Sequence, residues 1–295
     1  MIAELVNTKT EDGVRLEGAL MRAPVRHAGD LPVDLFICHH GVACNFYDPR
    51  LYGPLGDLLL ADGCDVLKVN NRGHDVVYNQ FGSGSPALRR TRGKLGAAFE
   101  LMDDCRFDWK AWIDFAQGAG YRRIGLWSHS LGAVKNLYFL ANGSDPRVRC
   151  AVASSPPRFR HASYLASPAG TAFSAAHERA KALLGAGDPH SLFSTTVPTP
   201  SVFTAQTFLD KYGPEDRFDY FPMLPKIRTP LLVTLGGDER ETAFIELNEQ
   251  GDALVKPVPG AGFARIEGAD HFYTGHCGEL WAAAKSWLAG IHVKD

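Results

Sequence analysis

The stretch Arg123-Ile124-Gly125-Leu126-Trp127-Ser128-His129-Ser130-Leu131-Gly132 decides the fold of this chain. A short apolar strand enters a small polar turn, and a helical pattern follows over residues 131–141. Such a strand-to-helix turn exposes a serine hydroxyl at the end of a parallel sheet, beside the first N–H groups of the helix. Gly132 suits the close approach of strand and helix. We therefore interpret Ser130 as a candidate nucleophile.

Two other interpretations of this turn remain open. Serine is a favoured helix N-cap residue, so Ser130 could serve only that purpose. Ser128 is a second hydroxyl in the same turn, and it occupies a position where glycine is usual. Ser128 fits the nucleophile position less well, because Gly132 then has no matching role.

Apolar segments of strand length alternate with helical patterns on both sides of this turn. Helices are predicted over residues 49–61, 96–119, 131–141 and 278–289. Strands are predicted over residues 2–9, 14–21, 33–38, 65–69, 123–127, 148–153, 229–235 and 263–266. Regular alternation predicts an α/β fold, with a mostly parallel sheet of about eight strands flanked by helices.

One long segment interrupts the alternation. Residues 158–225 hold no strand of the core type, are rich in Ala, Ser, Phe and His, and have a helical pattern around 175–184. We predict a core domain of residues 1–157 and 226–295, with 158–225 as an inserted cap. The aromatic residues of the cap either line an apolar acyl pocket or pack the cap onto the core. They are Phe159, Tyr164, Phe173, Phe193, Phe203 and Phe208.

Two further segments follow predicted strands and complete a catalytic arrangement. Gly236-Gly237-Asp238-Glu239 supplies a carboxylate, and Gly268-Ala269-Asp270-His271-Phe272 supplies an imidazole. Ligands bind beyond the carboxyl ends of parallel strands, so these segments are expected to meet Ser130. We predict Ser130, Asp238 and His271 as a triad. Asp238 could instead cap a helix, and Glu239 is then the alternative acid. His276 is the alternative imidazole.

The segment His39-His40-Gly41-Val42 follows the first core strand. The backbone N–H groups of Val42 and Leu131 are the predicted donors to an oxyanion. His39 and His40 could instead form a metal site with His74, Asp75 or Asp270. The spacing lacks a helical histidine pair or a compact Cys/His set, so we expect neither a metal nor another cofactor.

Together these segments resemble the α/β-hydrolase superfamily, in particular its capped esterase-like and lipase-like members. The matching stretches are His40-Gly41, Asn71-Arg72-Gly73-His74, Ser128-His129-Ser130-Leu131-Gly132, Gly237-Asp238 and Asp270-His271-Phe272. The resemblance implies the α/β-hydrolase fold and cofactor-free hydrolysis, most often of esters. In the superfamily, the stretch that Asn71–His74 resembles most often stabilises loop architecture.

Composition limits the partners. The 31 basic and 33 acidic residues leave a net charge of −2, which favours neither nucleic acid nor a membrane surface. The expected partner is a small-molecule ester or acyl substrate, and a homodimer remains open. The six cysteines form no CxxC pair, and the N-terminus lacks the pattern of a signal peptide. We therefore expect free thiols and a cytoplasmic protein.

The function predicted from the sequence is a serine hydrolase that cleaves a carboxylic ester or related acyl bond of a small molecule through an acyl-enzyme. Hydrolysis of a C–C bond, a thioester or a lactone, or acyl transfer, would use the same triad, because the fold does not choose among these reactions. A binding protein that retains the fold without catalysis is the alternative from another class.

Overall fold

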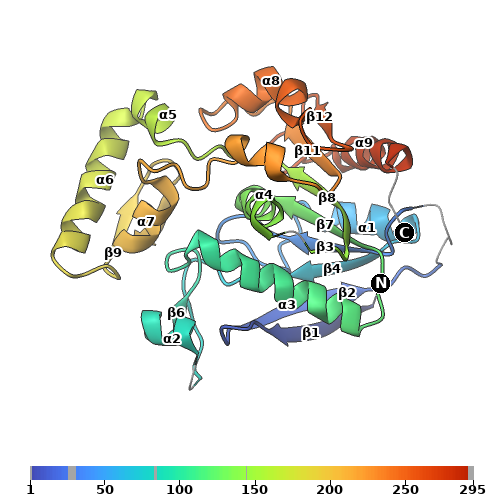
Figure 1. Cartoon of the computed structure of the whole chain (residues 1–295), viewed down its shortest axis with the longest axis horizontal. Coiled ribbons are helices and arrows are strands. Elements are labelled where there is room, and N and C mark those ends of the chain that lie inside the picture. Colours follow the sequence, from blue (N-terminus) through green and yellow to red (C-terminus); the bar gives the residue numbers. More distant parts are fainter. Residues whose placement is uncertain (1, 26–30, 83–84, 144, 292–295) are drawn as a thin grey trace.

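An eight-stranded sheet runs through the middle of the protein (Figure 1). The structure is a computed structural model, and it describes residues 2–25, 31–82, 85–143 and 145–291. In spatial order the strands are β1 (Ala3–Lys9), β2 (Arg15–Met21), β4 (Asp65–Val69), β3 (Leu35–His39), β7 (Ile124–His129), β8 (Val148–Ser154), β11 (Leu231–Gly236) and β12 (Gly262–Ile266). The predicted mostly parallel sheet is confirmed, and every strand boundary lies within two residues of the prediction.

The centre of the sheet and its first edge differ both in strand direction and in burial. From β4 to β12 neighbouring strands are parallel, whereas β2 runs antiparallel to both β1 and β4. Every residue of β3, β7 and β11 is buried, because helices cover both faces of the central sheet. The edge strand β1 has mostly exposed residues. The hairpin between β1 and β2 turns at Gly13, whose φ of 91° suits glycine.

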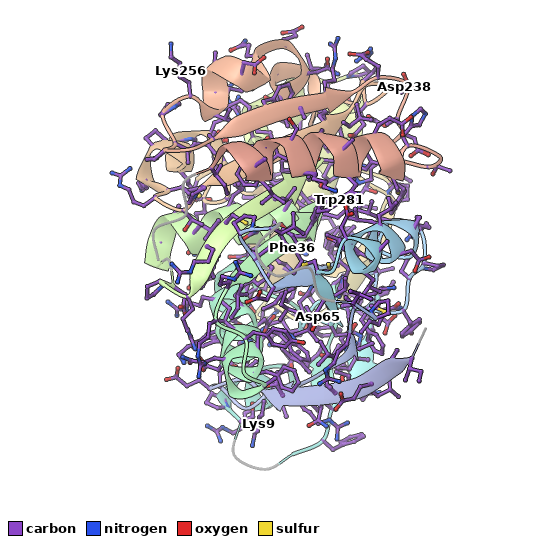
Figure 2. All side chains as sticks on the ribbon, turned by 90° about the vertical axis from the view of Figure 1, so that its right-hand side faces the viewer. Lys9, Phe36, Asp65, Asp238, Lys256 and Trp281 are labelled. Carbon is purple, nitrogen blue, oxygen red and sulfur yellow. The ribbon has the colours of Figure 1, made fainter. Side chains whose placement is uncertain are left out.

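Helices pack on opposite faces of the sheet. One face carries α1 (Pro54–Ala61) and α9 (Cys277–Gly290), and the other carries α3 (Cys105–Gly118), α4 (Leu131–Gly143) and α8 (Ile245–Val255). Alternate strand residues enter the two cores, since successive side chains point to opposite faces. Trp127 packs with Trp281 of α9, whereas Leu126 joins Trp112 of α3. Phe36 and Trp281, labelled in Figure 2, are both buried.

Two predicted helices begin later than expected. The first starts at Pro54 instead of residue 49, and the second at Cys105 instead of residue 96, after the 3₁₀ turn η1 (Met102–Asp104). Residues 96–98 donate their backbone N–H groups to carbonyls of the 72–76 loop, for example Gly96 to Arg72 at 3.0 Å. These bonds to another segment replace helical ones. Between the two helices lie β5 (Tyr78–Asn79), α2 (Pro86–Thr91) and β6 (Lys94–Leu95).

The segment predicted as a cap carries its own small elements. They are α5 (His161–Ala166), α6 (Gly170–Gly185), β9 (Leu192–Thr195), β10 (Ser201–Thr204), α7 (Ala205–Tyr212) and the 3₁₀ helix η2 (Phe221–Lys226). Strands β9 and β10 pair only with each other among the described residues. Figure 1 shows α5, α6 and α7 to the left of the sheet. Near the end of the segment, Tyr220 and Leu224 pack into the main core beside α4.

The structure also gives the state of the cysteines and the character of the helices. All six cysteines are free thiols; five are buried, and Cys44 is partly exposed. Across the described ranges, no helix combines the length and the apolar character needed to cross a membrane.

Candidate active site

Ser130 occupies the turn between β7 and α4 in a conformation that side chains seldom adopt. Its φ is 54°, in the left-handed region. Neighbouring backbone compensates for this: the Ser130 N–H donates to the Ser154 carbonyl at 2.9 Å, and its carbonyl accepts from the N–H groups of Ala133 and Val134. The predicted strand-to-helix turn is therefore present, and both β8 and α4 hold it.

Close packing explains the small residues around this turn. A Cβ atom on Gly132 would lie 2.4 Å from the His40 carbonyl oxygen, and one on Gly41 would lie 3.0 Å from the Ser130 Cβ. Ser128, in the position where glycine is usual, is completely buried. Its hydroxyl donates to the Val152 carbonyl at 3.2 Å and accepts from the Asn136 amide at 2.9 Å. Because both bonds are internal, Ser128 does not compete with Ser130.

His271 connects Ser130 to a carboxylate. Its Nε2 lies 2.9 Å from the Ser130 Oγ, and its Nδ1 lies 2.6 Å from an oxygen of Glu239. A carboxylate only accepts hydrogen bonds, so Nδ1 carries the proton and Nε2 is left to accept the serine hydroxyl. The loop after β12 carries His271, and the loop after β11 carries Glu239. The structure thus brings Ser130 and His271 together as predicted.

The predicted contact between Asp238 and His271 is wrong, and Glu239 takes this position. Asp238 is exposed, and Figure 2 shows it at the surface. In the turn after β11, the Gly237 N–H donates to the carbonyl of Ile266 at the end of β12, and the Asp238 N–H donates to the carbonyl of Ala269 in the loop that follows. The Glu239 N–H donates to the Gly236 carbonyl. This turn directs the Asp238 side chain outward and buries Glu239, which is 2% exposed. The two acids are adjacent, and only this turn distinguishes them.

The sequence analysis missed Ser155 and Tyr273, which support the Glu239 carboxylate, Ser155 directly and Tyr273 through Ser155. The second oxygen of Glu239 accepts from the Ser155 hydroxyl at 2.5 Å and from the Gly236 N–H at 2.8 Å. Ser155 also contacts the Tyr273 hydroxyl at 2.9 Å, which in turn lies 2.8 Å from Thr234 Oγ1. Burial raises the pKa of Tyr273, so its hydroxyl stays protonated. The only sequence signal for Ser155 was its position directly after a strand.

The two predicted oxyanion residues lie beside Ser130. Leu131 is the first residue of α4, so its N–H has no intrahelical acceptor. Val42 follows β3, and both residues line the pocket that contains Ser130 and His271. Their assignment as oxyanion donors stays a prediction.

The histidines at the end of β3 have structural contacts. His39 is buried and stacks on Trp109 with ring centroids 4.2 Å apart, and burial lowers its pKa well below the usual value. His40 Nδ1 lies 2.7 Å from the Gly41 carbonyl, and its Nε2 lies 3.3 Å from the Asn71 amide. Burial lowers the pKa of His40 to about 3, so the ring is neutral. Within the described ranges, no group of three His, Cys, Asp or Glu side chains is arranged to hold a metal.

A pocket of ≈ 660 Å³ opens onto Ser130 and His271 from between the core and residues 158–225. Of the six cap aromatics, Phe159, Tyr164 and Phe173 line this pocket. The other three, Phe193, Phe203 and Phe208, are buried within the segment predicted as a cap. All six belong to one buried cluster that also includes Met102, Leu131 and Val134 of the core, so the set packs against the core, and three of its members also line the pocket. Tyr212 also lines the pocket and was not anticipated.

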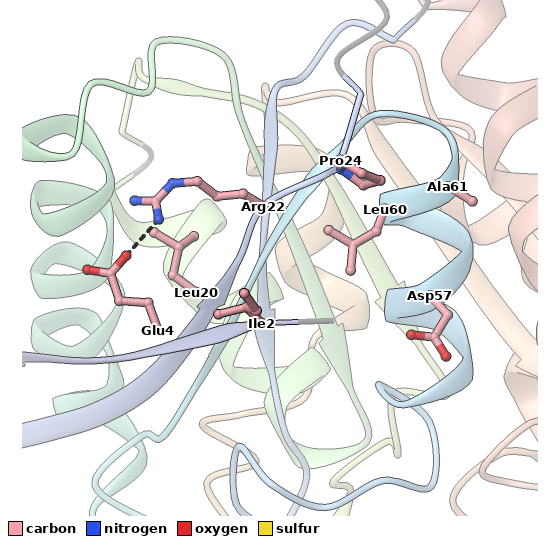
Figure 3. Close-up of a pocket in the computed structure, with 8 residues that line it drawn as sticks. All are labelled: Ile2, Glu4, Leu20, Arg22, Pro24, Asp57, Leu60 and Ala61. Atoms are coloured by element: carbon pink, nitrogen blue, oxygen red, sulfur yellow. Dashed lines mark hydrogen bonds and ion pairs between the residues drawn. The ribbon is translucent and has the colours of Figure 1, made fainter.

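A second hollow of ≈ 610 Å³ lies between the N-terminal hairpin and α1 (Figure 3). Figure 3 shows Glu4 paired with Arg22 there, at 2.6 Å, with apolar Leu20 and Leu60 nearby. Among the residues that the structure describes, its lining includes no serine, cysteine or histidine. The pocket at Ser130 instead contains a hydroxyl that is hydrogen-bonded to an imidazole, so we assign the candidate active site to that pocket.

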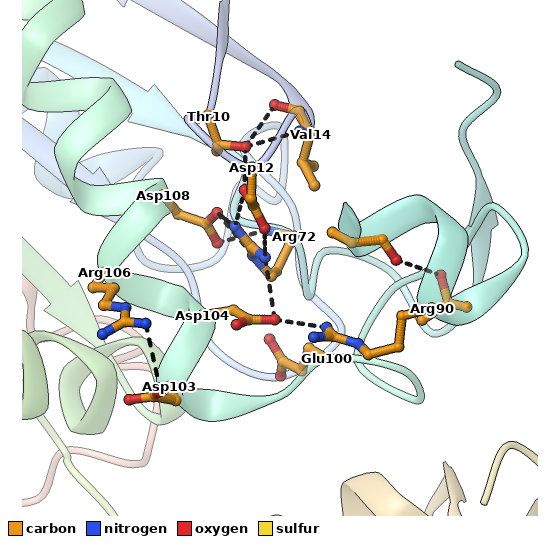
Figure 4. A network of polar contacts seen from close by, with 12 residues as sticks. Thr10, Asp12, Val14, Arg72, Arg90, Glu100, Asp103, Asp104, Arg106 and Asp108 are labelled. Carbon is orange, nitrogen blue, oxygen red and sulfur yellow. Dashed lines mark hydrogen bonds and ion pairs between the residues drawn. The ribbon is translucent and has the colours of Figure 1, made fainter. Parts of the chain in front are cut away.

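Packed against the Asn71–His74 loop is a set of buried and partly buried charges that we name the buried ion cluster. Its members are Asp12, Arg72, Glu100, Asp104, Asp108, Lys135 and Lys211. Arg72 is 1% exposed and contacts Asp12 at 2.7 Å, Asp108 at 2.8 Å and Asp104 at 3.3 Å (Figure 4). These bonds hold the loop to β1–β2 and α3, in line with the structural role that the family resemblance implied.

Glu100 joins this cluster to the predicted cap. It contacts Lys135 of α4 at 2.5 Å and Lys211 of α7 at 2.8 Å. Burial favours the neutral carboxyl, but the two ammonium groups offset this and lower the pKa of Glu100 to about 2. Gly73 leaves the space that Glu100 needs, because a Cβ there would lie 1.9 Å from the carboxylate.

Comparisons with known proteins agree with this fold. The sequence profile of the Alpha/beta hydrolase family matches residues 36–284. No curated protein matches the chain significantly.

Solved structures with the same fold include an esterase, Pf2001 of Pyrococcus furiosus, with 18% identity and a TM-score of 0.61 over 98% of this chain and 92% of that one. Est1E of Butyrivibrio proteoclasticus, solved with ferulic acid bound, has 16% identity and a TM-score of 0.63 over 97% and 98%. The α/β hydrolase GrgF of Penicillium sp. sh18 has 15% identity and a TM-score of 0.65 over 98% and 99%.

Proposed function

Because the chain belongs to the alpha/beta hydrolase family, we propose that it is a serine hydrolase that cleaves a carboxylic ester of a small molecule. One observation carries the proposal: an unbroken series of hydrogen bonds from Ser130 through His271 to Glu239, ending at a pocket. A chain that only bound ligands would need no such series. In this proposal, Ser130 is the nucleophile, His271 the general base and Glu239 the acid of the triad.

The first half of the reaction transfers the acyl group to Ser130. As the Ser130 oxygen attacks the ester carbonyl, its proton moves to Nε2 of His271. Nδ1–H keeps its bond to Glu239, whose carboxylate stabilises the imidazolium. The bond from the carbonyl carbon to the alcohol oxygen then breaks, and the alcohol leaves with the proton from His271. The product is an acyl-enzyme on Ser130.

The backbone would stabilise the charge that develops on the carbonyl oxygen. The N–H groups of Leu131 and Val42 are the proposed donors, and Leu131 also benefits from its position at the N-terminus of α4. One such donor contributes about 3–4 kcal/mol to catalysis in comparable enzymes. Water then attacks the acyl-enzyme with His271 again as base, which releases the acid and restores the Ser130 hydroxyl.

The pocket favours an ester with one apolar part. Phe159, Tyr164, Phe173 and Tyr212 give it an aromatic wall, whereas the groups that would react with a carbonyl lie on the Ser130 side. Two of the structural neighbours named above add weight: one is described as an esterase, and the other holds ferulic acid. At 18% and 16% identity, neither neighbour identifies the substrate of this chain.

Labelling and turnover together test the proposal. A fluorophosphonate probe should label the wild-type protein, and p-nitrophenyl esters should be hydrolysed. Ser130→Ala should abolish both. Ser128→Ala, a matched control that removes the neighbouring internal hydroxyl, should retain labelling. If Ser130→Ala keeps full activity, or if Ser128→Ala alone loses labelling while it stays folded, the nucleophile is misassigned.

A further inference from the structure

His129 connects two loops of the candidate site that the sheet itself does not join. Ser130 follows β7 and His271 follows β12, and two strands, β8 and β11, separate these in the sheet. The 2.9 Å distance from Ser130 Oγ to His271 Nε2 therefore depends on the relative placement of two distant loops. A direct bond between these loops would maintain that distance.

His129 makes such a bond. Its Nε2 lies 2.7 Å from the backbone carbonyl oxygen of His271. A carbonyl oxygen only accepts, so the Nε2 of His129 carries the proton and donates it. His129 immediately precedes Ser130, so the bond joins the nucleophile turn to the peptide group of the proposed base.

The surroundings of His129 favour one geometry and one charge state. The side chain is 3% exposed, and its ring centroid lies 4.7 Å from that of His271 and 5.1 Å from that of Phe272. Burial, together with the nearby His271, lowers the pKa of His129 to about 3. The ring therefore stays neutral, and it does not repel the imidazolium that His271 forms during the proposed reaction.

We propose that His129 is a positioning residue, whose Nε2–H bond to the His271 carbonyl holds the base at Ser130. This inference rests on the proposed function. His129 donates no proton to the substrate and accepts none from it. Its effect is on geometry, and a small misplacement of catalytic groups can slow a reaction about 10²-fold.

Three substitutions separate the hydrogen bond from packing. His129→Gln places an amide N–H near the position of Nε2, so it can still donate. His129→Phe keeps a flat ring without a donor, and His129→Leu removes both. For the Phe and Leu variants we expect kcat for a p-nitrophenyl ester to fall about 10–100-fold, with KM within about twofold of wild type. His129→Gln should restore kcat to within about threefold.

Fluorophosphonate labelling rates should follow kcat in these variants, and melting temperatures identify any variant that has lost its fold. If His129→Leu fails to fold, the comparison of kcat between His129→Phe and His129→Gln still tests the proposal. The proposal is overturned if His129→Phe retains the wild-type kcat. It is also overturned if His129→Gln loses as much kcat as His129→Phe, since lost packing would then explain the effect. Wild-type protein that is not labelled would overturn the proposed function as well, whereas a labelled wild type with indifferent variants overturns this inference alone.

Discussion

The buried ion cluster and the candidate active site both place carboxylates beside basic groups, yet they differ in where their hydrogen bonds end. Arg72 is surrounded by Asp12, Asp104 and Asp108, and all of these contacts lie within the protein. The series from Glu239 through His271 ends at the Ser130 hydroxyl, on the wall of a pocket. Buried charge alone is therefore a weak sign of an active site, and we propose the active site where the series ends at a reactive group beside open space.

The basic groups of the two regions, the Arg72 guanidinium and the His271 imidazole, differ in their ability to exchange a proton. The aspartates around Arg72 raise the pKa of its guanidinium further, so it does not exchange a proton. An imidazole can accept and release a proton near neutral pH, as the proposed mechanism requires of His271. The cluster is thus suited to hold a loop, and the site to transfer protons.

The largest expected effect distinguishes the two adjacent acids. Glu239→Gln keeps the shape of the side chain but offers an amide N–H to His271, which favours the wrong tautomer. We expect kcat to fall about 10⁴-fold, as when the triad acid is neutralised in serine proteases. Steady-state hydrolysis of a p-nitrophenyl ester measures this. Asp238→Asn is the control and should stay within about twofold; a loss with Asp238→Asn instead would restore the original assignment.

A second substitution tests whether the buried ion cluster contributes only to stability. Arg72→Met leaves buried carboxylates without their partner, so the free energy of unfolding should fall by about 3–5 kcal/mol. Molecules that remain folded should keep kcat within about threefold. Urea denaturation and active-site titration give the two values. Arg22→Met removes an exposed ion pair with Glu4 and should cost about 1 kcal/mol or less. Equal losses in the two variants would contradict the comparison.

A smaller effect is expected at the support of the triad acid. Ser155→Ala removes one of the two hydrogen bonds to the second oxygen of Glu239, while the bond from Gly236 remains. Hydrogen bonds to charged groups contribute about 1.5–3 kcal/mol, so kcat should fall roughly tenfold or more. Ser154→Ala serves as the control, because the Ser154 hydroxyl contacts Trp127 and Thr234 and not Glu239. Unchanged kcat in Ser155→Ala would remove Ser155 from the proposed site.

The smallest expected effect, counted per pH unit, is an acid dependence of stability. Glu100 has its pKa lowered from 4.5 to about 2 in the folded protein, so the unfolded chain binds more protons between these pH values. Its contribution is present above about pH 4.5 and is lost as the pH falls toward 2, by about 1.4 kcal/mol per pH unit. Urea denaturation at several pH values measures the slope. Glu100→Gln should be less stable than wild type above about pH 4.5, and the difference should shrink as the pH falls toward 2, which gives the variant a flatter profile. An equally steep profile would contradict this origin.

Local patterns were sufficient to predict the sheet, the nucleophile turn and the histidine. The buried strands β3, β7 and β11 are continuous apolar runs, which are readable without the fold. Ser130 is marked by its neighbours Leu131 and Gly132, and the need for Gly132 follows from the close approach of His40. These features depend on residues near one another in the chain, or on the general order of elements in this fold.

Tertiary contacts decided the remainder. Asp238 and Glu239 are equivalent in local pattern, and only the hydrogen bonds between the β11 and β12 loops turn one outward and the other inward. Ser155, Tyr273 and His129 acquire their contacts from residues more than 80 positions away. The sequence by itself thus determined the fold and pointed to the proposed nucleophile, Ser130, and the proposed base, His271. The choice of acid and its supporting hydroxyls depended on side-chain directions at loop ends, which are set by contacts between loops that no local pattern records.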